Sequence, residues 1–178
     1  MQDLNVDGLV FSFPADWVVG KYDDWSFYRN QFAKLWQGIK SLDLLAVNPG
    51  KTAWLIEVKD YRHHARTKPS ELSVEVAHKV FDTLAAMLPA KLHAIDTDQK
   101  TLARAVCHAT SLRVVLHLAQ PRSSGSKLFG RVINPANLTQ QLRKLLKPID
   151  AHPMVIDQRT MGGVDWQVHD KTRWNPSC

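Results

Sequence analysis

Apolar and polar residues alternate along the chain in patterns that predict short strands and longer helices. Leu9–Phe13 is an apolar run that Pro14 stops, which predicts a strand. Between Ser41 and Arg62, two apolar runs flank the turn sequence Asn48–Gly50. Because Asn, Pro and Gly favour turns while Val, Ile and Trp favour strands, this segment predicts a β-hairpin.

The pattern becomes helical from Asp16 to about Gln37. Large apolar side chains recur there at three- and four-residue spacing, at Trp25, Tyr28, Phe32, Leu35 and Trp36. That spacing gives one stripe of an amphipathic helix, which we expect to pack in the core. Asp23 and Asp24 fall near the start of this helix, where carboxylates suit the positive end of the helix dipole.

A second helix is predicted from Ser70 to Leu88, where Pro89 ends it. Its inner face is expected to comprise five apolar residues, Val76, Val80, Phe81, Leu84 and Leu88. Glu75 and Lys79 lie four residues apart, so we expect them to form an ion pair on the outside of the helix.

Leu112 to Leu118 reads as a buried strand, after a further helical stretch at about Asp98 to Ala109. A strand, a helical layer and a second strand make a βαβ crossover, which joins parallel strands. Together with the antiparallel hairpin, this crossover predicts an α/β fold with a central mixed β-sheet flanked by helices.

The last third of the chain adds three elements and a loop. Asn134–Pro135 supplies an N-cap and a first-turn proline for a helix that ends near Leu146. The inner face of that helix is expected to comprise Leu138, Leu142, Leu145 and Leu146. Met154–Ile156 predicts a short strand, and Val164–His169 an edge strand. The polar segment Gln120–Gly130 is a candidate mobile flap.

Length and composition predict one domain over residues 1–178, because a chain of 178 residues buries about 70% of its unfolded surface. No apolar run reaches the 18 or so residues of a membrane span. The first residues carry acids where a secretory signal would carry bases, so we expect a cytoplasmic protein. The two cysteines, Cys107 and Cys178, are then free thiols rather than a disulfide.

The formal net charge of +6 is compatible with a polyanionic partner. Its distribution is more informative, because five basic residues cluster directly after the hairpin. They are Arg62, His63, His64, Arg66 and Lys68. A loop of this composition either contacts nucleic-acid phosphates or is merely solvated, and we take phosphate contact as the working hypothesis.

The hairpin also brings together three charged residues. In its second strand, Glu57 and Lys59 are two positions apart and therefore share one face. Asp43 lies in the first strand, at a distance from the turn comparable to that of Glu57. The flanking apolar runs place these charges at the edge of a core, where buried charges need partners or a metal.

This set of groups suits metal-dependent phosphodiester cleavage. Two carboxylates, Asp43 and Glu57, can hold Mg²⁺ or Mn²⁺, and the Val58 carbonyl is a candidate third ligand. A lysine beside the cation, Lys59, can orient the attacking water or help to deprotonate it, and can neutralise developing negative charge. The competing interpretation is a weak surface ion pair between Glu57 and Lys59.

The pattern Asp43, then Glu57-Val58-Lys59, resembles the restriction-endonuclease-like superfamily of PD-(D/E)xK nucleases. The resemblance implies a restriction-endonuclease-like core over roughly residues 20–120. It also implies that Asp43, Glu57 and the Val58 carbonyl bind metal and that Lys59 serves the attacking water.

The chain departs from that family pattern in two respects. Leu42 stands where the motif has proline, a position at which many members differ. Many members also carry a glutamate on the helix before the first strand, whereas Glu57 is the first glutamate of this chain. Asp23 or Asp24 could take the place of that glutamate, and Gln31 could also reach the site.

The resulting hypothesis is a Mg²⁺- or Mn²⁺-dependent nuclease that hydrolyses DNA. A homodimer or a targeting partner protein would suit it, since cutting both strands commonly requires two active sites. The alternative is a non-catalytic nucleic-acid-binding or protein-interaction module on the same fold. A third interpretation is a plain α/β interaction domain in which the three charges form a surface cluster.

Overall fold

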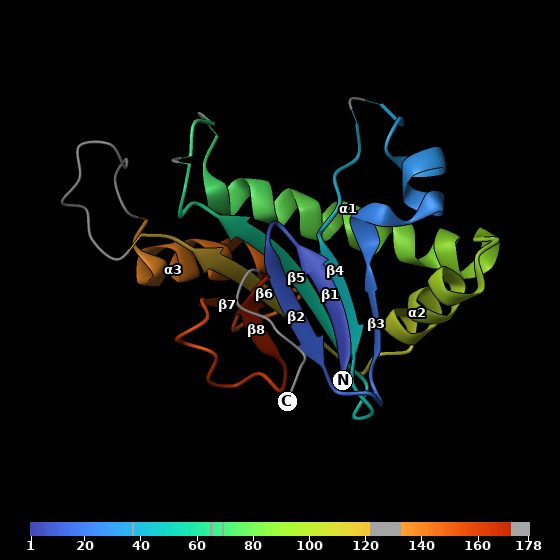
Figure 1. Ribbon diagram of the computed structural model, residues 1–178. Helices are drawn as coiled ribbons and strands as arrows, with labels where there is room; N and C mark the ends of the chain where they lie inside the picture. The colour runs from blue at the N-terminus through green and yellow to red at the C-terminus, as the bar shows by residue number, and fades with distance from the viewer. Residues whose placement is uncertain (37, 65, 69, 122–132, 172–178) are drawn as a thin grey trace.

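The computed structural model of the 178-residue chain describes residues 1–36, 38–64, 66–68, 70–121 and 133–171. These residues form three layers. Helices cover one face of a central five-stranded sheet, and a second sheet of three strands covers the other face (Figure 1).

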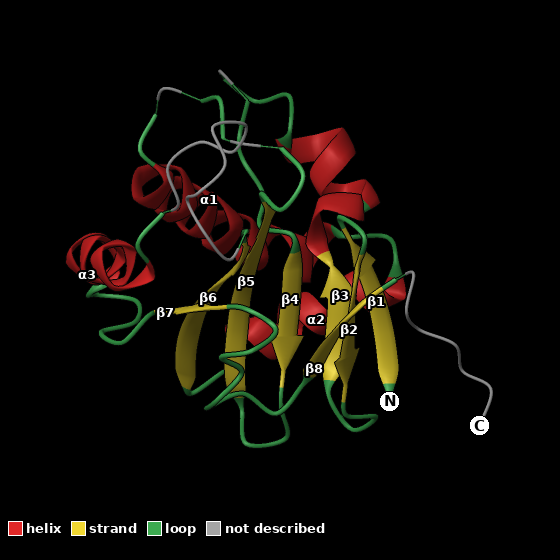
Figure 2. Cartoon of the chain, turned by 60° about the vertical axis from the view of Figure 1, so that its left-hand side comes forward, coloured by secondary structure: helices red, strands yellow, loops and turns green. Residues whose placement is uncertain are grey.

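The central sheet confirms the predicted mixed topology. Its strands follow one another in chain order, as Figure 2 shows: β3 (Val18–Lys21), β4 (Leu44–Val47), β5 (Thr52–Asp60), β6 (Ser111–Ala119) and β7 (Met154–Ile156). The pairs β3–β4 and β4–β5 are antiparallel, whereas β5–β6 and β6–β7 are parallel. The predicted hairpin is therefore β4–β5.

Helical crossovers join the parallel strands, and the one between β5 and β6 is the crossover that the sequence predicts. Helices α1 (Leu72–His93) and α2 (Thr97–Cys107) link β5 to β6, and α3 (Pro135–Leu146) links β6 to β7. The side chain of Asn134 caps α3 by accepting from the backbone N–H of Ala136 at 2.9 Å. Leu138, Leu142 and Leu146 are buried against the sheet, whereas Leu145 is exposed, contrary to expectation.

Alternating residues of β5 enter two different cores. Ala53 and Leu55 pack in the core between the central sheet and the helices. Trp54, Ile56 and Val58 pack in the core on the opposite face. Both faces of this strand are buried, as expected for a parallel strand covered by a layer on each side.

The second core lies under a sheet that the sequence pattern predicts only in part. This sheet has the order β1 (Gln2–Val6), β2 (Leu9–Phe13), β8 (Gln167–Asp170), and all its pairs are antiparallel. The predicted strand Leu9–Phe13 is confirmed. The strand expected at Val164–His169 begins later, and it pairs with β2 rather than with the central sheet.

The helix predicted from Asp16 to Gln37 is wrong. Its first part is strand β3, and only a 3₁₀ turn (Tyr22–Asp24) and a short π-helix (Tyr28–Phe32) follow. Of the predicted stripe, Trp25, Tyr28 and Phe32 pack in the core on the helix side, whereas Trp17, earlier in the segment, packs under the second sheet. Leu35 and Trp36 are exposed.

Helix α1 also differs from its prediction. It continues through Pro89 for another turn to His93. Val76, Val80, Met87 and Ala90 are buried along its length, so tertiary packing outweighs the hydrogen bond that proline cannot donate. Phe81 and Leu88, expected on the inner face, are exposed.

Residues 122–130 of the candidate flap lie outside the described residues. Within the part of the chain that the structure describes, none of the helices combines the length and the apolar character needed to cross a bilayer.

Candidate functional site

The hairpin register sets the position of Asp43 relative to Glu57. Leu44 pairs with Ile56, so Asp43 directly precedes β4 on the same side as Glu57 in β5. The Asp43 Oδ2 atom accepts a hydrogen bond from the Val58 backbone N–H at 2.6 Å. This contact fixes the carboxylate beside β5, one residue before Leu44, the first paired residue of β4. The role of the Val58 carbonyl as a ligand stays a prediction.

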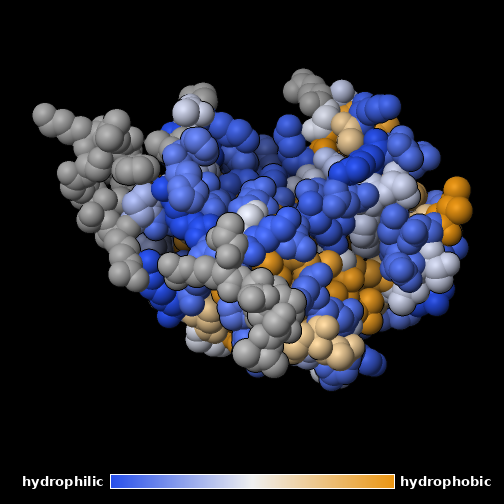
Figure 3. All heavy atoms as spheres, in the orientation of Figure 1, coloured by the Kyte–Doolittle hydropathy of each residue, from blue (hydrophilic) through white to orange (hydrophobic). Residues whose placement is uncertain are grey.

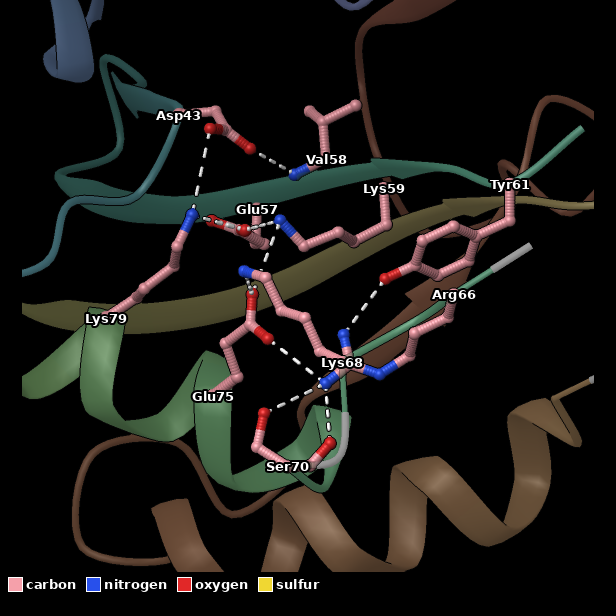
Figure 4. Close-up of polar contacts among 10 residues, drawn as sticks. All are labelled: Asp43, Glu57, Val58, Lys59, Tyr61, Arg66, Lys68, Ser70, Glu75 and Lys79. Atoms are coloured by element: carbon pink, nitrogen blue, oxygen red, sulfur yellow. Dashed lines mark hydrogen bonds and ion pairs between the residues drawn. The ribbon is translucent and has the colours of Figure 1, made fainter. Parts of the chain in front are cut away.

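Glu57 points from β5 towards α1, on the face that the strand periodicity predicts for it (Figure 4). Its side chain has no exposed surface. The Oε1 atom accepts from Lys59 Nζ at 2.5 Å and from Lys79 Nζ at 2.6 Å. The Oε2 atom is buried without a hydrogen-bond partner in the structure. Glu57 is thus a buried carboxylate with one oxygen doubly paired and the other unsatisfied.

The protonation of Glu57 depends on opposing effects. Burial raises its pKa to about 7, and the nearby carboxylate of Asp43 adds to the rise. The ammonium groups of Lys79 and Lys59 work in the opposite direction. A divalent cation at the site would favour the ionised form, as these ammonium groups do.

Lys59 is held in its charged form. Burial by itself would lower the pKa of Lys59, but the carboxylates of Glu57, Asp43 and Glu75 outweigh it, so the pKa is raised. In this arrangement Lys59 remains an ammonium near neutral pH. It is therefore suited to orienting groups and neutralising charge, and not to removing a proton from water.

Helix α1 supplies two residues that sequence reasoning placed wrongly. Glu75 and Lys79 face the site and not the outside of the helix, with side chains only 13% and 16% exposed. Glu75 lies 3.8 Å from Lys59 Nζ, and Lys79 contacts Glu57. The sequence held one indication of this position. Glu75 and Lys79 are four residues apart at the edge of the buried stripe, and that spacing fits a pair facing the sheet as well as an exposed pair.

The basic residues after β5 divide into two groups. Arg66 and Lys68 both pair with Glu75, at 3.1 and 3.3 Å, and so lie next to the site. Arg66 also donates to the Ser70 carbonyl at 2.6 Å and to the Tyr61 hydroxyl at 3.2 Å. His63 and His64 are exposed. Phosphate contact by this loop stays a prediction.

Arg62 already has a structural contact. Its guanidinium binds Asp60 through Nε and Nη2, at 2.9 and 2.6 Å, and also binds Asp170. These carboxylates raise its pKa despite some burial, with the hydrogen bond to Asp60 as the largest cause. Because Asp60 belongs to the central sheet and Asp170 to the second sheet, Arg62 connects the two.

The structure distinguishes among the substitutes for the missing upstream glutamate. Asp24 pairs with Lys21 at 3.0 Å and with Arg29. Gln31 is exposed. Asp23 lies 3.9 Å from Lys21 through Oδ2, and its Oδ1 atom is buried without a hydrogen-bond partner. Burial raises the pKa of Asp23, Lys21 opposes the rise, and the nearby charge of Asp43 adds to it. Asp23 is therefore better placed than Asp24 to act with Asp43.

A solvent-facing pocket of about 250 Å³ borders the site. It is lined by Lys59, Asp60, Tyr61, His64, Arg66, Thr67, Lys68 and Glu75. Figure 3 shows hydrophilic residues over much of the molecular face in the orientation of Figure 1. The pocket reaches Lys59, so a polar ligand entering it could approach the buried carboxylate from the side of the basic loop.

Two features of the site would suit a hard divalent cation. Carboxylate oxygens are the ligands that Mg²⁺ and Mn²⁺ prefer. The Glu57 Oε2 atom has no hydrogen-bond partner, and a cation could take that position. Within the described ranges, no group of three or more His, Cys, Asp or Glu residues could hold a metal ion. Two protein carboxylates suffice where water and substrate phosphates complete the coordination, as is common for Mg²⁺.

Comparison with known proteins gives a similarity to part of a longer protein. The chain is 28% identical to a cysteine--tRNA ligase from Neisseria meningitidis serogroup A / serotype 4A (strain DSM 15465 / Z2491). The similarity covers 97% of this chain but only 30% of the ligase, so the chain spans less than a third of that protein. No family model and no solved structure matches the chain.

Proposed function

We propose that this protein is a Mg²⁺- or Mn²⁺-dependent nuclease with a restriction-endonuclease-like core, and that it hydrolyses phosphodiester bonds in DNA. The observation that carries the proposal is the convergence of Asp43, Glu57 and Lys59 at the end of the hairpin. There, a fully buried carboxylate has an unsatisfied oxygen. Lys59 and Lys79 pair with one oxygen of this carboxylate, and a bound cation would give the other oxygen the partner that it lacks.

Each residue of the site has a defined task under this proposal. Asp43 and Glu57 hold the cation, and the Val58 N–H bond keeps Asp43 in place. Bound there, a divalent cation would supply Lewis-acid stabilisation of the scissile phosphate and would make the attacking water more acidic. Lys59, kept as an ammonium, neutralises the negative charge that develops on the phosphate. Arg66 and Lys68 attract neighbouring phosphates along the backbone.

Cleavage assays test this proposal. Wild-type protein is incubated with supercoiled, linear or single-stranded DNA in Mg²⁺, Mn²⁺ or chelator, beside Asp43→Asn and Lys59→Met. We expect metal-dependent cutting that falls by about 100-fold or more in both variants, since each removes an electrostatic contribution to the transition state. Lys144→Met, an exposed change on α3, is the matched control. Undiminished cutting by folded Asp43→Asn or Lys59→Met would contradict the assignment.

One observation favours the second candidate, a non-catalytic nucleic-acid-binding or protein-interaction module on the same fold. The Lys79 ammonium lies 2.6 Å from Glu57 Oε1 and 4.0 Å from Asp43 Oδ1, and the Lys59 ammonium lies 2.5 Å from Glu57 Oε1, so two positive charges balance the two carboxylates without a metal. This candidate predicts salt-sensitive DNA binding or a protein partner, with no metal-dependent turnover in the same assays.

The substrate panel should include tRNA and a non-specific RNA. The protein to which this chain is similar is named for its action on tRNA. Cleavage of tRNA in preference to DNA would move the proposal from a deoxyribonuclease to a ribonuclease with the same site.

The oligomeric state during cutting tests the proposed homodimer, because double-strand cleavage by a monomer would argue against it.

A further inference from the structure

Lys79 reaches the site from α1, on the opposite side from the backbone of β5. Its Nζ atom lies 2.6 Å from Glu57 Oε1 and 4.0 Å from Asp43 Oδ1. Figure 4 shows the Lys79 nitrogen with a dashed line to each of these carboxylates. A positive charge therefore bridges the same two groups that the proposed function assigns to a divalent cation.

We infer that Lys79 occupies the place of the divalent cation in the metal-free protein, and that the cation must displace its ammonium to bind Asp43 and Glu57. This inference rests on the proposed function for the existence of the cation site. It goes further by assigning Lys79 control over how tightly that site binds metal.

The balance of charge requires the displacement. When Glu57 is ionised, as cation binding requires, Asp43 and Glu57 carry two negative charges, and Lys59 and Lys79 carry two positive charges in contact with them. A divalent cation added beside both ammonium groups would leave the site strongly positive. Repulsion between a divalent cation and an ammonium is twice that between two ammonium groups at the same distance, and it is screened weakly near a buried group.

The contacts indicate which lysine leaves. Lys59 also lies 3.8 Å from Glu75 Oε1, so it keeps a carboxylate partner when Glu57 turns to a cation. The ion pairs of Lys79 among the described residues are with Asp43 and Glu57, the two groups that the cation would take. The Lys79 side chain is also 16% exposed on a flexible four-carbon stem, so its ammonium can move towards solvent.

Mn²⁺ binding to the full chain tests the inference. Free Mn²⁺ is measured by electron paramagnetic resonance during titration of wild type, Lys79→Met and Asp43→Asn, each checked for folding by circular dichroism. We expect Lys79→Met to bind Mn²⁺ about tenfold or more tightly than wild type, because the competing charge is gone. Asp43→Asn should lose the binding. Lys91→Met, on the same helix but paired with His108, should retain the wild-type affinity.

The outcomes separate the inference from the proposed function. Equal Mn²⁺ affinity in wild type and Lys79→Met, with loss in Asp43→Asn, would overturn the role of Lys79 and leave the cation site intact. Binding by neither wild type nor Lys79→Met would overturn both the inference and the metal-dependent function. Binding by Lys79→Met alone would support the inference in its strongest form.

A second variant covers the case in which Lys79→Met does not fold. Lys79→Gln removes the charge but can still donate a hydrogen bond to the buried Glu57. It should show the same gain in Mn²⁺ affinity. It should also show a larger rise in thermal unfolding midpoint on addition of Mn²⁺ than wild type does, because tighter binding stabilises the folded state more. An equal rise in both proteins would count against displacement.

Discussion

At the scale of single residues, Glu57 has an environment that is unusual for a glutamate. A fully buried carboxylate receives two lysine ammonium groups on one oxygen and has no hydrogen-bond partner on the other. Its pKa of about 7 lies far above the ordinary value for glutamate because burial penalises the charged form. This combination has a measurable consequence for stability.

We expect the stability of wild type to fall, relative to that of Glu57→Gln, as the pH rises from about 5 to about 8. Folded Glu57 keeps its proton up to about pH 7, whereas the unfolded chain releases it near the ordinary glutamate pKa of 4.5. The folded state therefore holds more protons in that window, and raising the pH destabilises it by about 3 kcal/mol at most. Glutamine lacks this titration.

Urea denaturation of both proteins across this pH range measures the effect, with metal excluded by chelator. The comparison with Glu57→Gln cancels the contribution of other titrating groups, which both proteins share. Parallel stability profiles for the two proteins would show that Glu57 titrates normally in the folded state.

At the scale of elements, β6 presents a histidine to the second sheet. His117 has no exposed surface, neither ring nitrogen has a hydrogen-bond partner in the structure, and the ring lies edge-on to Phe11 of β2 with centroids 5.2 Å apart. Burial lowers the pKa of His117 to about 4, while Asp157 opposes the shift. The two sheets therefore pack around a neutral imidazole.

We expect His117→Phe to reduce the loss of stability in acid. The unfolded chain takes up a proton at His117 near pH 6.5 and the folded chain only near pH 4, so wild-type stability falls as the pH drops through that window. The lost contribution is about 1–3 kcal/mol. Thermal unfolding at about pH 4.5 and about pH 7 measures it. His63→Gln, at an exposed position, should behave as wild type. An equal acid sensitivity of His117→Phe would contradict the account.

At the scale of the whole molecule, the connection between the layers depends on residues far apart in sequence. Arg62 follows β5 and binds Asp60 beside it and Asp170 in β8, which joins the central sheet to the second sheet. The sequence hypothesis assigned this arginine to nucleic acid together with Arg66 and Lys68. The structure gives it a tertiary contact, which can be separated from binding by experiment.

We expect Arg62→Met to lower the free energy of unfolding by about 1–2 kcal/mol, because it removes a partly exposed, charge-assisted contact between layers. Lys68→Met should leave stability almost unchanged. It should reduce the slope of the logarithm of the DNA-binding constant against the logarithm of salt concentration by about one, as expected for one lost phosphate contact. Urea denaturation and binding measured against salt concentration distinguish the two effects. A reduced salt slope in Arg62→Met without loss of stability would reverse the assignment.

The sequence by itself determined those parts of the fold that local patterns specify. The Asn48–Gly50 turn and its flanking apolar runs determined the β4–β5 hairpin, and two-residue alternation placed Glu57 and Lys59 on one face. Helical spacing and the Asn134 cap determined α3. Local geometry sufficed in these cases, because the residues that make each element are neighbours in the chain.

Only the tertiary structure decided which surfaces meet. Trp17 and Trp25 lie in the segment predicted to be one helix, yet they pack in different cores, because Val18–Lys21 between them forms a strand that pairs with the free edge of β4. Spacing places Lys79 at the border of the buried face of α1, but the strand packed against it decides that its ammonium meets Glu57 and Asp43. A local pattern defines the face of an element, whereas the partner of that face depends on long-range packing.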